Sequence, residues 1–148
     1  MATGPHVLIV EGRFYEDIAD ELAKGAIAEL EAQGASYERV GVPGVFEIPA
    51  AIRYALDSGR YDGFVALGCV IRGETTHYEY ICAESARGIG ELAVHFNAAV
   101  GYGILTTENR EQAWRRASVK EKNKGRDAAL ACLVMVALKS RLQGVEAE

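Results

Sequence analysis

The chain has 148 residues, of which 49% are hydrophobic and 25% are charged, and its formal net charge at pH 7 is −5. These proportions are ordinary for a water-soluble globule, and the length suits one domain, which we expect to span residues 1–148. The acidic balance argues against a nucleic-acid partner. The longest apolar run, residues 128–138, is well short of the ~20 residues that span a bilayer, which argues against a membrane partner.

The cysteine pattern bears on the compartment. Cys69, Cys82 and Cys132 are odd in number, far apart, and form no Cys-x-x-Cys pair. Such a pattern favours reduced intracellular thiols over a disulfide framework. The first six residues show no basic segment followed by an apolar one, so no signal peptide is expected. These features together predict a cytoplasmic protein.

The first half of the chain alternates between strand and helix patterns. His6–Val10 is a short apolar run typical of a buried parallel strand. An amphipathic helix is predicted next, ending near Gly34. Its apolar positions, at spacings of four, are Ile18, Leu22, Ala26 and Leu30. Residues 36–42 alternate weakly, which predicts a strand at a sheet edge. A second helix should follow, with Pro49 tolerated in its first turn and Gly59 at its end. Its apolar positions are Ile48, Ile52 and Leu56.

The second half continues the alternation. The apolar run Phe64–Ile71 predicts a strand, and a helix should run from His77 to about Phe96. Gly88 and Gly90 lie inside that helix, where close packing against a neighbour is the usual reason for a glycine. Three more elements should follow: a strand at Val100–Leu105, a short helix at Asn109–Trp114 and, after a polar loop at 118–125, a last helix from about Arg126 to Leu142.

This strict alternation with short links predicts the fold class. We expect an α/β fold, a three-layer α-β-α sandwich with a four-stranded parallel sheet and flavodoxin-like alternation. The last helix is apolar nearly all round from Ala128 to Leu138. Because one sheet face cannot bury that much apolar surface, we expect part of this helix to lie between subunits.

The segments after the predicted strands carry polar, aromatic and glycine residues. In parallel sheets, ligands bind beyond the carboxyl ends of the strands. Residues 76–79, Thr-His-Tyr-Glu, form a capping box that predicts a helix start at Thr76. Backbone amides around Gly73 to Thr75 would then lie at the positive end of a helix dipole, which favours a phosphate. The segments expected to meet there are Arg13-Phe14, Gly44–Glu47, Arg72–His77 and Thr106-Thr107.

Among the three histidines, His77 is the candidate for catalysis. A helix N-terminus favours the neutral imidazole, which suits a general base, although the position alone is equally compatible with a surface histidine. A nucleophilic pair of Cys69 with His77 is an alternative. However, Cys69 lies within an apolar strand, where a small buried side chain is the simpler interpretation. No second His or Cys has ligand spacing from His77, so no metal is expected.

Five motifs occur in one order along nearly the whole chain. They are Arg13-Phe14, residues 42–49 (Val-Pro-Gly-Val-Phe-Glu-Ile-Pro), residues 68–81, residues 103–109 and Asn123-Lys124-Gly125. Together they resemble the 6,7-dimethyl-8-ribityllumazine synthase family. The resemblance implies a transferase of riboflavin biosynthesis, which condenses 5-amino-6-(D-ribitylamino)uracil with 3,4-dihydroxy-2-butanone 4-phosphate. Phosphate and water would be released, and no metal or organic cofactor would be used.

The resemblance implies how the pyrimidine substrate would be held. Phe14 would stack on its ring, and Glu47 would accept hydrogen bonds from the hydroxyls of its ribityl chain. Two neighbours of Glu47, Val45 and Phe46, would hold the same ribityl chain. Backbone groups at the end of the third strand would bind the pyrimidine edge, and these belong to Cys69, Val70 and Ile71.

The resemblance likewise implies how the phosphorylated substrate would be held and converted. The amides of Glu74 and Thr75 would cradle the phosphate, with Arg116 as its counter-charge. His77 would transfer protons. Two further residues would reach the site from the adjacent subunit: Tyr102, which would bind the ribitylaminouracil, and Lys124. Tyr102 and two other residues, Tyr15 and Arg115, depart from the side chains usual in the family.

Assembly is a further implication, because the sites of this family lie between the subunits of a homo-oligomer. The loop 118–122 lacks the glycines typical of members that build icosahedral shells. A pentamer is therefore favoured, and an icosahedral 60-mer stays an alternative. Riboflavin synthase would be a functional partner.

Two other classes of protein share parts of this pattern. A non-catalytic flavodoxin-like or receiver-like ligand-binding domain would have the same alternation. A receiver, however, needs paired acids after the first strand and an Asp at the end of the third, whereas Glu11 stands alone and the third strand ends at Ile71-Arg72. A hydrolase that uses Cys69 would lose its activity in Cys69→Ser, whereas a synthase should barely change.

Overall fold

The computed structural model describes residues 4–144, so the first residues of the segment considered for a signal peptide lie outside it. Four strands form one parallel sheet in the order β2-β1-β3-β4. The strands are β1 His6–Gly12, β2 Ser36–Val42, β3 Gly63–Ile71 and β4 Val100–Thr107. The helices are α1 Glu16–Ala32, α2 Ile48–Ser58, α3 His77–His95, α4 Arg110–Ala117 and α5 Lys124–Leu142, with a 3-10 turn η1 at Val45–Glu47.

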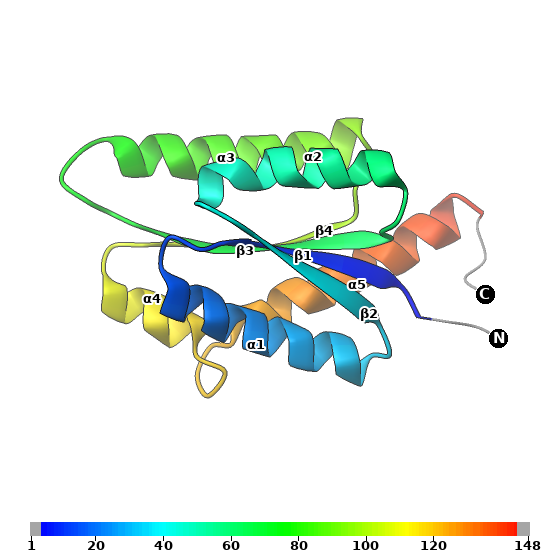
Figure 1. Cartoon of the computed structure of the whole chain (residues 1–148), viewed down its shortest axis with the longest axis horizontal. Coiled ribbons are helices and arrows are strands. Elements are labelled where there is room, and N and C mark those ends of the chain that lie inside the picture. The colour runs from blue at the N-terminus through cyan, green and yellow to red at the C-terminus, as the bar shows by residue number, and fades with distance from the viewer. Residues whose placement is uncertain (1–3, 145–148) are drawn as a thin grey trace.

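The sheet lies between two layers of helices, α2 and α3 on one face and α1, α4 and α5 on the other (Figure 1). Val7 and Ile9 of β1 belong to the core on the α1 side, whereas Leu8 and Val10 belong to the core on the α2 side. Burial on both faces explains why the strand is a continuous apolar run. The predicted three-layer α/β sandwich is confirmed, and so is the edge position of β2.

Most helix ends follow the sequence signals. Gly34 and Gly59 have φ values of 79° and 67°, and they lie just beyond α1 and α2 in the left-handed conformation that glycine tolerates. Asn109 caps α4, because its side-chain oxygen accepts a hydrogen bond from the backbone N–H of Gln112 at 2.9 Å. Pro49 lies in the first turn of α2, as predicted.

Two helix boundaries differ from the prediction. Helix α4 continues past Trp114 to Ala117, whose methyl group is fully buried in the core. Helix α5 begins at Lys124 rather than at about Arg126. Gly125 therefore lies inside the helix, where a Cβ would come 2.0 Å from the carbonyl oxygen of Leu22. This glycine lets α5 approach α1, which is a packing role that a local pattern cannot reveal.

The two glycines inside α3 differ from each other. A Cβ at Gly88 would come 2.9 Å from Cγ of Pro49, so close packing is confirmed there. The same prediction was wrong for Gly90, which is exposed and would place its Cβ in open space within the described chain. Gly90 lies on the solvent side of α3, away from the contact with α2.

Helix α5 packs closely on β4 and still leaves apolar side chains uncovered. A Cβ at Gly101 of β4 would come 1.8 Å from the carbonyl oxygen of Ala128, so glycine is required for this approach. On the outer side of α5, Val134 and Met135 remain 62% and 44% exposed. Within residues 4–144, no helix combines the length and apolarity needed to cross a membrane.

Candidate active site

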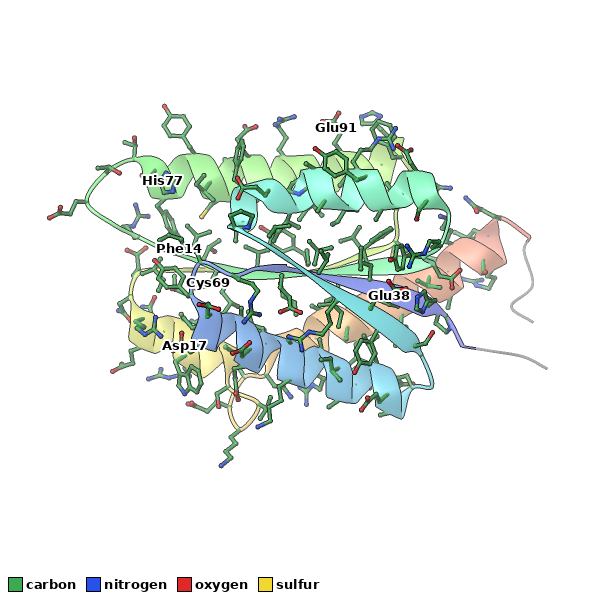
Figure 2. All side chains as sticks on the ribbon, in the orientation of Figure 1. Phe14, Asp17, Glu38, Cys69, His77 and Glu91 are labelled. Carbon is green, nitrogen blue, oxygen red and sulfur yellow. The ribbon has the colours of Figure 1, made fainter. Side chains whose placement is uncertain are left out.

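The strand order creates a crevice between β1 and β3. The chain leaves β1 for α1 on one face of the sheet and leaves β3 for α3 on the opposite face. The two loops therefore diverge at the carboxyl ends of these strands, which is where ligands bind in such sheets. Figure 2 shows Phe14, Cys69 and His77 together at this end of the molecule and Glu38 near the other end.

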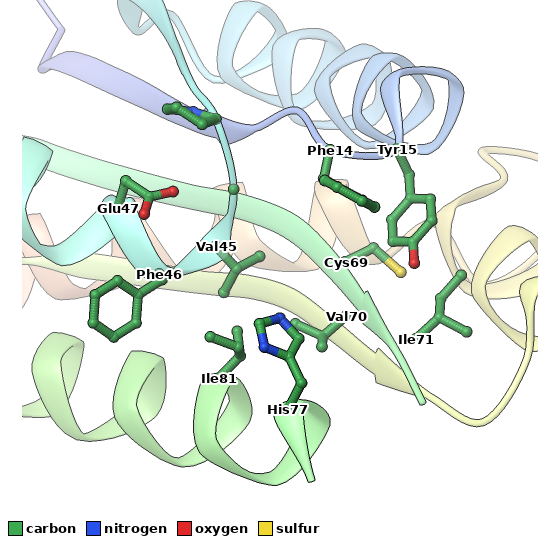
Figure 3. Close-up of a pocket in the computed structure, with 12 residues that line it drawn as sticks. Phe14, Tyr15, Val45, Phe46, Glu47, Cys69, Val70, Ile71, His77 and Ile81 are labelled. Carbon is green, nitrogen blue, oxygen red and sulfur yellow. The ribbon is translucent and has the colours of Figure 1, made fainter. Parts of the chain in front are cut away.

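A cleft of about 400 Å³ opens in this crevice (Figure 3). Its lining draws on four segments: the loop after β1, the turn η1 with the residues before it, the end of β3 and the start of α3. The predicted site residues that line it are Phe14, Val45, Phe46, Glu47, Cys69, Val70, Ile71 and His77. A volume of this size falls in the usual range of small-molecule sites.

The cleft has four lining residues that were not named individually as site residues: Tyr15, Pro43, Gly44 and Ile81. Of these, Gly44 had been expected there as the start of the segment Gly44–Glu47. Two of them had a usable signal. Tyr15 is adjacent to Phe14, and Ile81 is four residues after His77, so it lies on the same face of α3. Pro43 and Gly44 line the cleft because the chain turns there between β2 and η1.

Phe14 is an exposed aromatic at the wall of the cleft. Its side chain is 75% exposed, and its ring meets the ring of Tyr15 edge to face, with centroids 4.9 Å apart. The broad face of the ring is thus free to stack on a planar ligand, which would remove apolar surface from water.

Two glycines allow η1 to approach the sheet. A Cβ at Gly12 of β1 would come 3.0 Å from the backbone nitrogen of Val45, and a Cβ at Gly68 of β3 would come 2.7 Å from a methyl group of Val45. Val45 is therefore buried against the strands, while Phe46 and Glu47 remain exposed. The result is a carboxylate held at the cleft beside an apolar floor.

The start of α3 differs from the prediction. Thr76 occupies the N-cap position, but its side chain makes no capping hydrogen bond. Instead, Oγ1 of Thr75 accepts a hydrogen bond from the backbone N–H of His77 at 3.3 Å. The predicted capping box was wrong, and Glu79 pairs instead with Arg72 at 2.5 Å, an ion pair that competes with capping.

This start still leaves donors for an anion. Among the hydrogen bonds within residues 4–144, none uses the backbone N–H of Glu74 or Thr75. Both residues are exposed in the loop that precedes His77, just outside the lining of the cleft. His77 itself points into the cleft from the first turn of α3, toward Val45 and Val70 (Figure 3).

The thiol of Cys69 is poorly suited to nucleophilic attack. Its side chain is buried, and burial raises the pKa of Cys69 to about 11, although a hydrogen bond to Thr107 acts in the opposite direction. The thiol is therefore protonated near neutral pH, whereas the thiolate is the nucleophile. In the described part of the chain, no three His, Cys, Asp or Glu side chains are grouped so as to hold a metal ion.

Three predicted site residues lie elsewhere, in a second hollow of about 440 Å³ lined by β4, α4 and α5. They are Tyr102, Arg116 and Lys124. Nη1 of Arg116 donates to the carbonyl oxygen of Gln112 at 3.1 Å, and among the described residues it pairs with no carboxylate. Lys124 lies 3.5 Å from a carboxylate oxygen of Asp127. One chain therefore brings together the residues predicted for the pyrimidine substrate except Tyr102, and it leaves Arg116 apart from Glu74 and Thr75.

Known proteins resemble the chain over nearly its full length. A family model for 6,7-dimethyl-8-ribityllumazine synthase matches residues 4–140. The 6,7-dimethyl-8-ribityllumazine synthase of Bartonella tribocorum is 56% identical over 142 residues, covering 95% of this chain and 94% of that one. The protein of the same name from Agrobacterium fabrum is 53% identical over 145 residues, covering 95% of this chain and 98% of that one. The chain therefore belongs to the 6,7-dimethyl-8-ribityllumazine synthase family.

Proposed function

We propose that the cleft between β1 and β3 is the pyrimidine half of this transferase's active site. The chain is an enzyme of riboflavin biosynthesis, which condenses 5-amino-6-(D-ribitylamino)uracil with 3,4-dihydroxy-2-butanone 4-phosphate. The products are 6,7-dimethyl-8-ribityllumazine, phosphate and two molecules of water. The observation that carries the proposal is the convergence of Phe14, Glu47 and His77 on one cleft from three separate segments.

The lining suits a planar ring that carries a polyol chain. Phe14 stacks on the pyrimidine, and the backbone at Cys69, Val70 and Ile71 binds its edge. Glu47, beside Val45 and Phe46, accepts hydrogen bonds from the ribityl hydroxyls. Hydrogen bonds from hydroxyl groups to a carboxylate orient a ligand as well as bind it.

His77 moves protons between the reacting groups. An amine of the pyrimidine attacks the ketone, and a first water leaves as the imine forms. Phosphate is then eliminated, and the second amine attacks the carbonyl that remains, so that a second water leaves as the ring closes. Each of these steps transfers a proton, so one imidazole beside the reacting carbons can serve them in turn. Holding two substrates in contact supplies much of the remaining acceleration.

The second hollow completes the site from an adjacent copy of the chain. Arg116 groups with Tyr102 and Lys124 rather than with the cleft, which supports a site built from two subunits. Arg116 then meets the phosphate that the amides of Glu74 and Thr75 cradle, and it stabilises the leaving group. The exposed apolar side of α5 supports a homo-oligomer, for which we favour a pentamer over an icosahedral 60-mer.

We further place this chain in the cytoplasm as a single domain, with riboflavin synthase consuming its product. The two cores on either face of one sheet support the single domain. No cofactor or metal enters the scheme, because amine attack, dehydration and phosphate elimination are all acid–base steps.

The test is conversion of the two purified substrates, followed by the fluorescence of the lumazine product, with a chelator present. We expect a rate far above the uncatalysed condensation, and native mass spectrometry should report a pentamer. Binding of the pyrimidine without any acceleration would instead favour a non-catalytic binding domain. Activity that depends on added metal would contradict the scheme.

A further inference from the structure

Glu11 is a buried acid outside the cleft. Its side chain is 2% exposed, and it lies on the same side of β1 as Val7 and Ile9, facing the helix layer that contains α1. A carboxylate in such a place is costly unless hydrogen-bonded cations surround it. In the sequence, Glu11 follows directly on an apolar run, between Val10 and Gly12. A lone acid in that position could have indicated a cluster of charged side chains.

Two arginines satisfy this carboxylate. Arg39 of β2 donates from Nε at 2.7 Å and from Nη2 at 3.0 Å, and Arg13 donates from Nη1 at 2.5 Å. The other arm of the Arg13 guanidinium donates to Asp20 of α1 at 2.6 Å. We call these four residues, Glu11, Arg13, Asp20 and Arg39, the Arg13 cluster. The planar fork of Arg13 thus joins the strand to the helix on either side of the loop that contains Phe14.

The backbone of Arg13 is held as well. Its N–H donates to the carbonyl oxygen of Val42 at 3.0 Å, which extends the contact between β1 and β2 by one residue. A Cβ at Gly41 would come 2.9 Å from Cδ of Arg13, so a glycine there leaves room for the arginine stem. Arg13 therefore attaches the loop after β1 to the end of β2, immediately before the cleft residues Pro43 and Gly44.

Phe14, by contrast, has little packing of its own. Its side chain is 75% exposed, and its aromatic contact within the described residues is the perpendicular ring of Tyr15. The position of the Phe14 ring thus depends on the backbone on either side of it. Because Arg13 is the preceding residue, the contacts that fix Arg13 also fix the backbone from which the ring projects.

We propose that the Arg13 cluster positions Phe14, so that Glu11 and Arg39 set the affinity for the pyrimidine ring although neither lines the cleft. The inference rests on the proposed role of Phe14. Lysine cannot replace Arg13 in this role, because an ammonium group lacks the rigid fork that bonds Glu11 and Asp20 together.

A double-mutant cycle tests the proposal, with purified 6,7-dimethyl-8-ribityllumazine as the fluorescent probe of binding. We expect Arg13→Lys and Phe14→Leu each to raise the Kd for the probe about tenfold, in line with the loss of one aromatic stack. The double variant should bind no more weakly than Phe14→Leu alone, since Arg13 acts through Phe14. The KM for the phosphorylated substrate should not change in Arg13→Lys.

Additive losses, or an unchanged Kd in Arg13→Lys, would overturn the positioning role while leaving the proposed function intact. An unchanged Kd in Phe14→Leu would overturn the role of Phe14 in the proposed function itself, and this inference with it. The two failures are thus distinguishable within one experiment.

A matched pair of variants separates positioning from general loss of charge. Glu11→Gln should raise the Kd several-fold. Glu38→Gln should leave it unchanged, because Glu38 also accepts hydrogen bonds from an arginine, Arg60 at 2.9 Å, but lies away from the cleft (Figure 2). If Glu11→Gln does not fold, Arg39→Lys replaces it in the comparison. Arg39 is 44% exposed, so the substitution should be tolerated, and lysine keeps the positive charge while losing the bidentate fork. The proposal would be contradicted if the variant of Glu11, or that of Arg39, bound the fluorescent probe with the same Kd as Glu38→Gln.

Discussion

The cleft and the second hollow are similar in size, about 400 and about 440 Å³, but opposite in character. The cleft offers an exposed aromatic ring, a carboxylate and an imidazole, from Phe14, Glu47 and His77. The hollow offers a phenol and two cations, from Tyr102, Arg116 and Lys124. The two substrates differ in the same way, because one is a planar ring with a polyol and the other carries a phosphate. Under the proposed roles, one chain carries both kinds of recognition, but on separate surfaces.

This separation has a geometric cause. The cleft lies beyond β1 and β3, whereas the hollow lies along the edge strand β4 and the helix α5. Repeated head-to-tail contact between copies would bring the hollow of one copy to the cleft of the next, and such a contact closes into a ring when the rotation permits. Variants in the cleft and variants in the hollow should therefore affect the use of different substrates.

The largest effect is expected in the cleft. Replacing His77 by alanine should lower kcat by about a hundredfold or more, because proton transfer at every step loses its carrier. The measurement is the rate of lumazine formation at saturating substrates. His95→Ala is the matched control, since His95 lies at the opposite end of the same helix and is exposed. Full activity in His77→Ala would remove this residue from the mechanism.

A smaller and more selective effect is expected in the hollow. Arg116→Ala should raise the KM for the phosphorylated substrate about tenfold, which corresponds to one charge-assisted hydrogen bond. Pyrimidine affinity should stay unchanged. Arg115→Ala is the control, because Arg115 faces the acids Glu111 and Glu121 rather than the hollow. Equal losses for both substrates would contradict the division of labour between the two surfaces.

Mixing the two variants tests the division directly. If His77→Ala and Arg116→Ala chains are unfolded together and reassembled, some sites receive an intact cleft from one chain and an intact hollow from the other. Random assembly should restore roughly a quarter of the sites. The measurement is the recovered rate relative to reassembled unaltered protein, at a concentration of the phosphorylated substrate well below its KM, where each variant alone is slow. No recovery would show that both residues serve the site of one chain.

The smallest effect is expected at Cys69. Cys69→Ser should keep nearly full activity, and iodoacetamide should modify Cys69 slowly at pH 7. Because burial raises the pKa of its thiol to about 11, the neutral form predominates below that pH and reactivity should rise only as the pH approaches it. Peptide mapping by mass spectrometry separates this signal from Cys82. Rapid modification at pH 7 together with loss of activity would revive the hydrolase alternative.

Sequence reasoning succeeded where the cause of a feature is local. Continuous apolar runs marked β1 and β3, and Gly59 and Asn109 marked helix ends, because each depends on residues within one turn or strand. It failed where a distant partner decided the outcome. Glu79 pairs with Arg72 instead of forming the predicted capping box, and the close contact predicted for Gly90 has no partner in the part of the chain that the structure describes.

The site shows the same limit. The motifs contain nearly all the residues that line the cleft. None of them indicated that Arg116 lies apart from Glu74 and Thr75 in the folded chain. Nor did they show that Glu11 is buried between two arginines beside the loop of Phe14. Both facts depend on which strand ends meet.

The sequence by itself determined the order of elements, the parallel sheet and the family, because hydrophobic period, glycine conformation and motif spacing are properties of neighbouring residues. Only the tertiary structure decided that the predicted residues fall on two surfaces rather than one. It also decided that Arg13 can join β1, β2 and α1 around Phe14. The physical reason is that sheet order and helix packing set distances between residues far apart in the chain, and no local pattern encodes those distances.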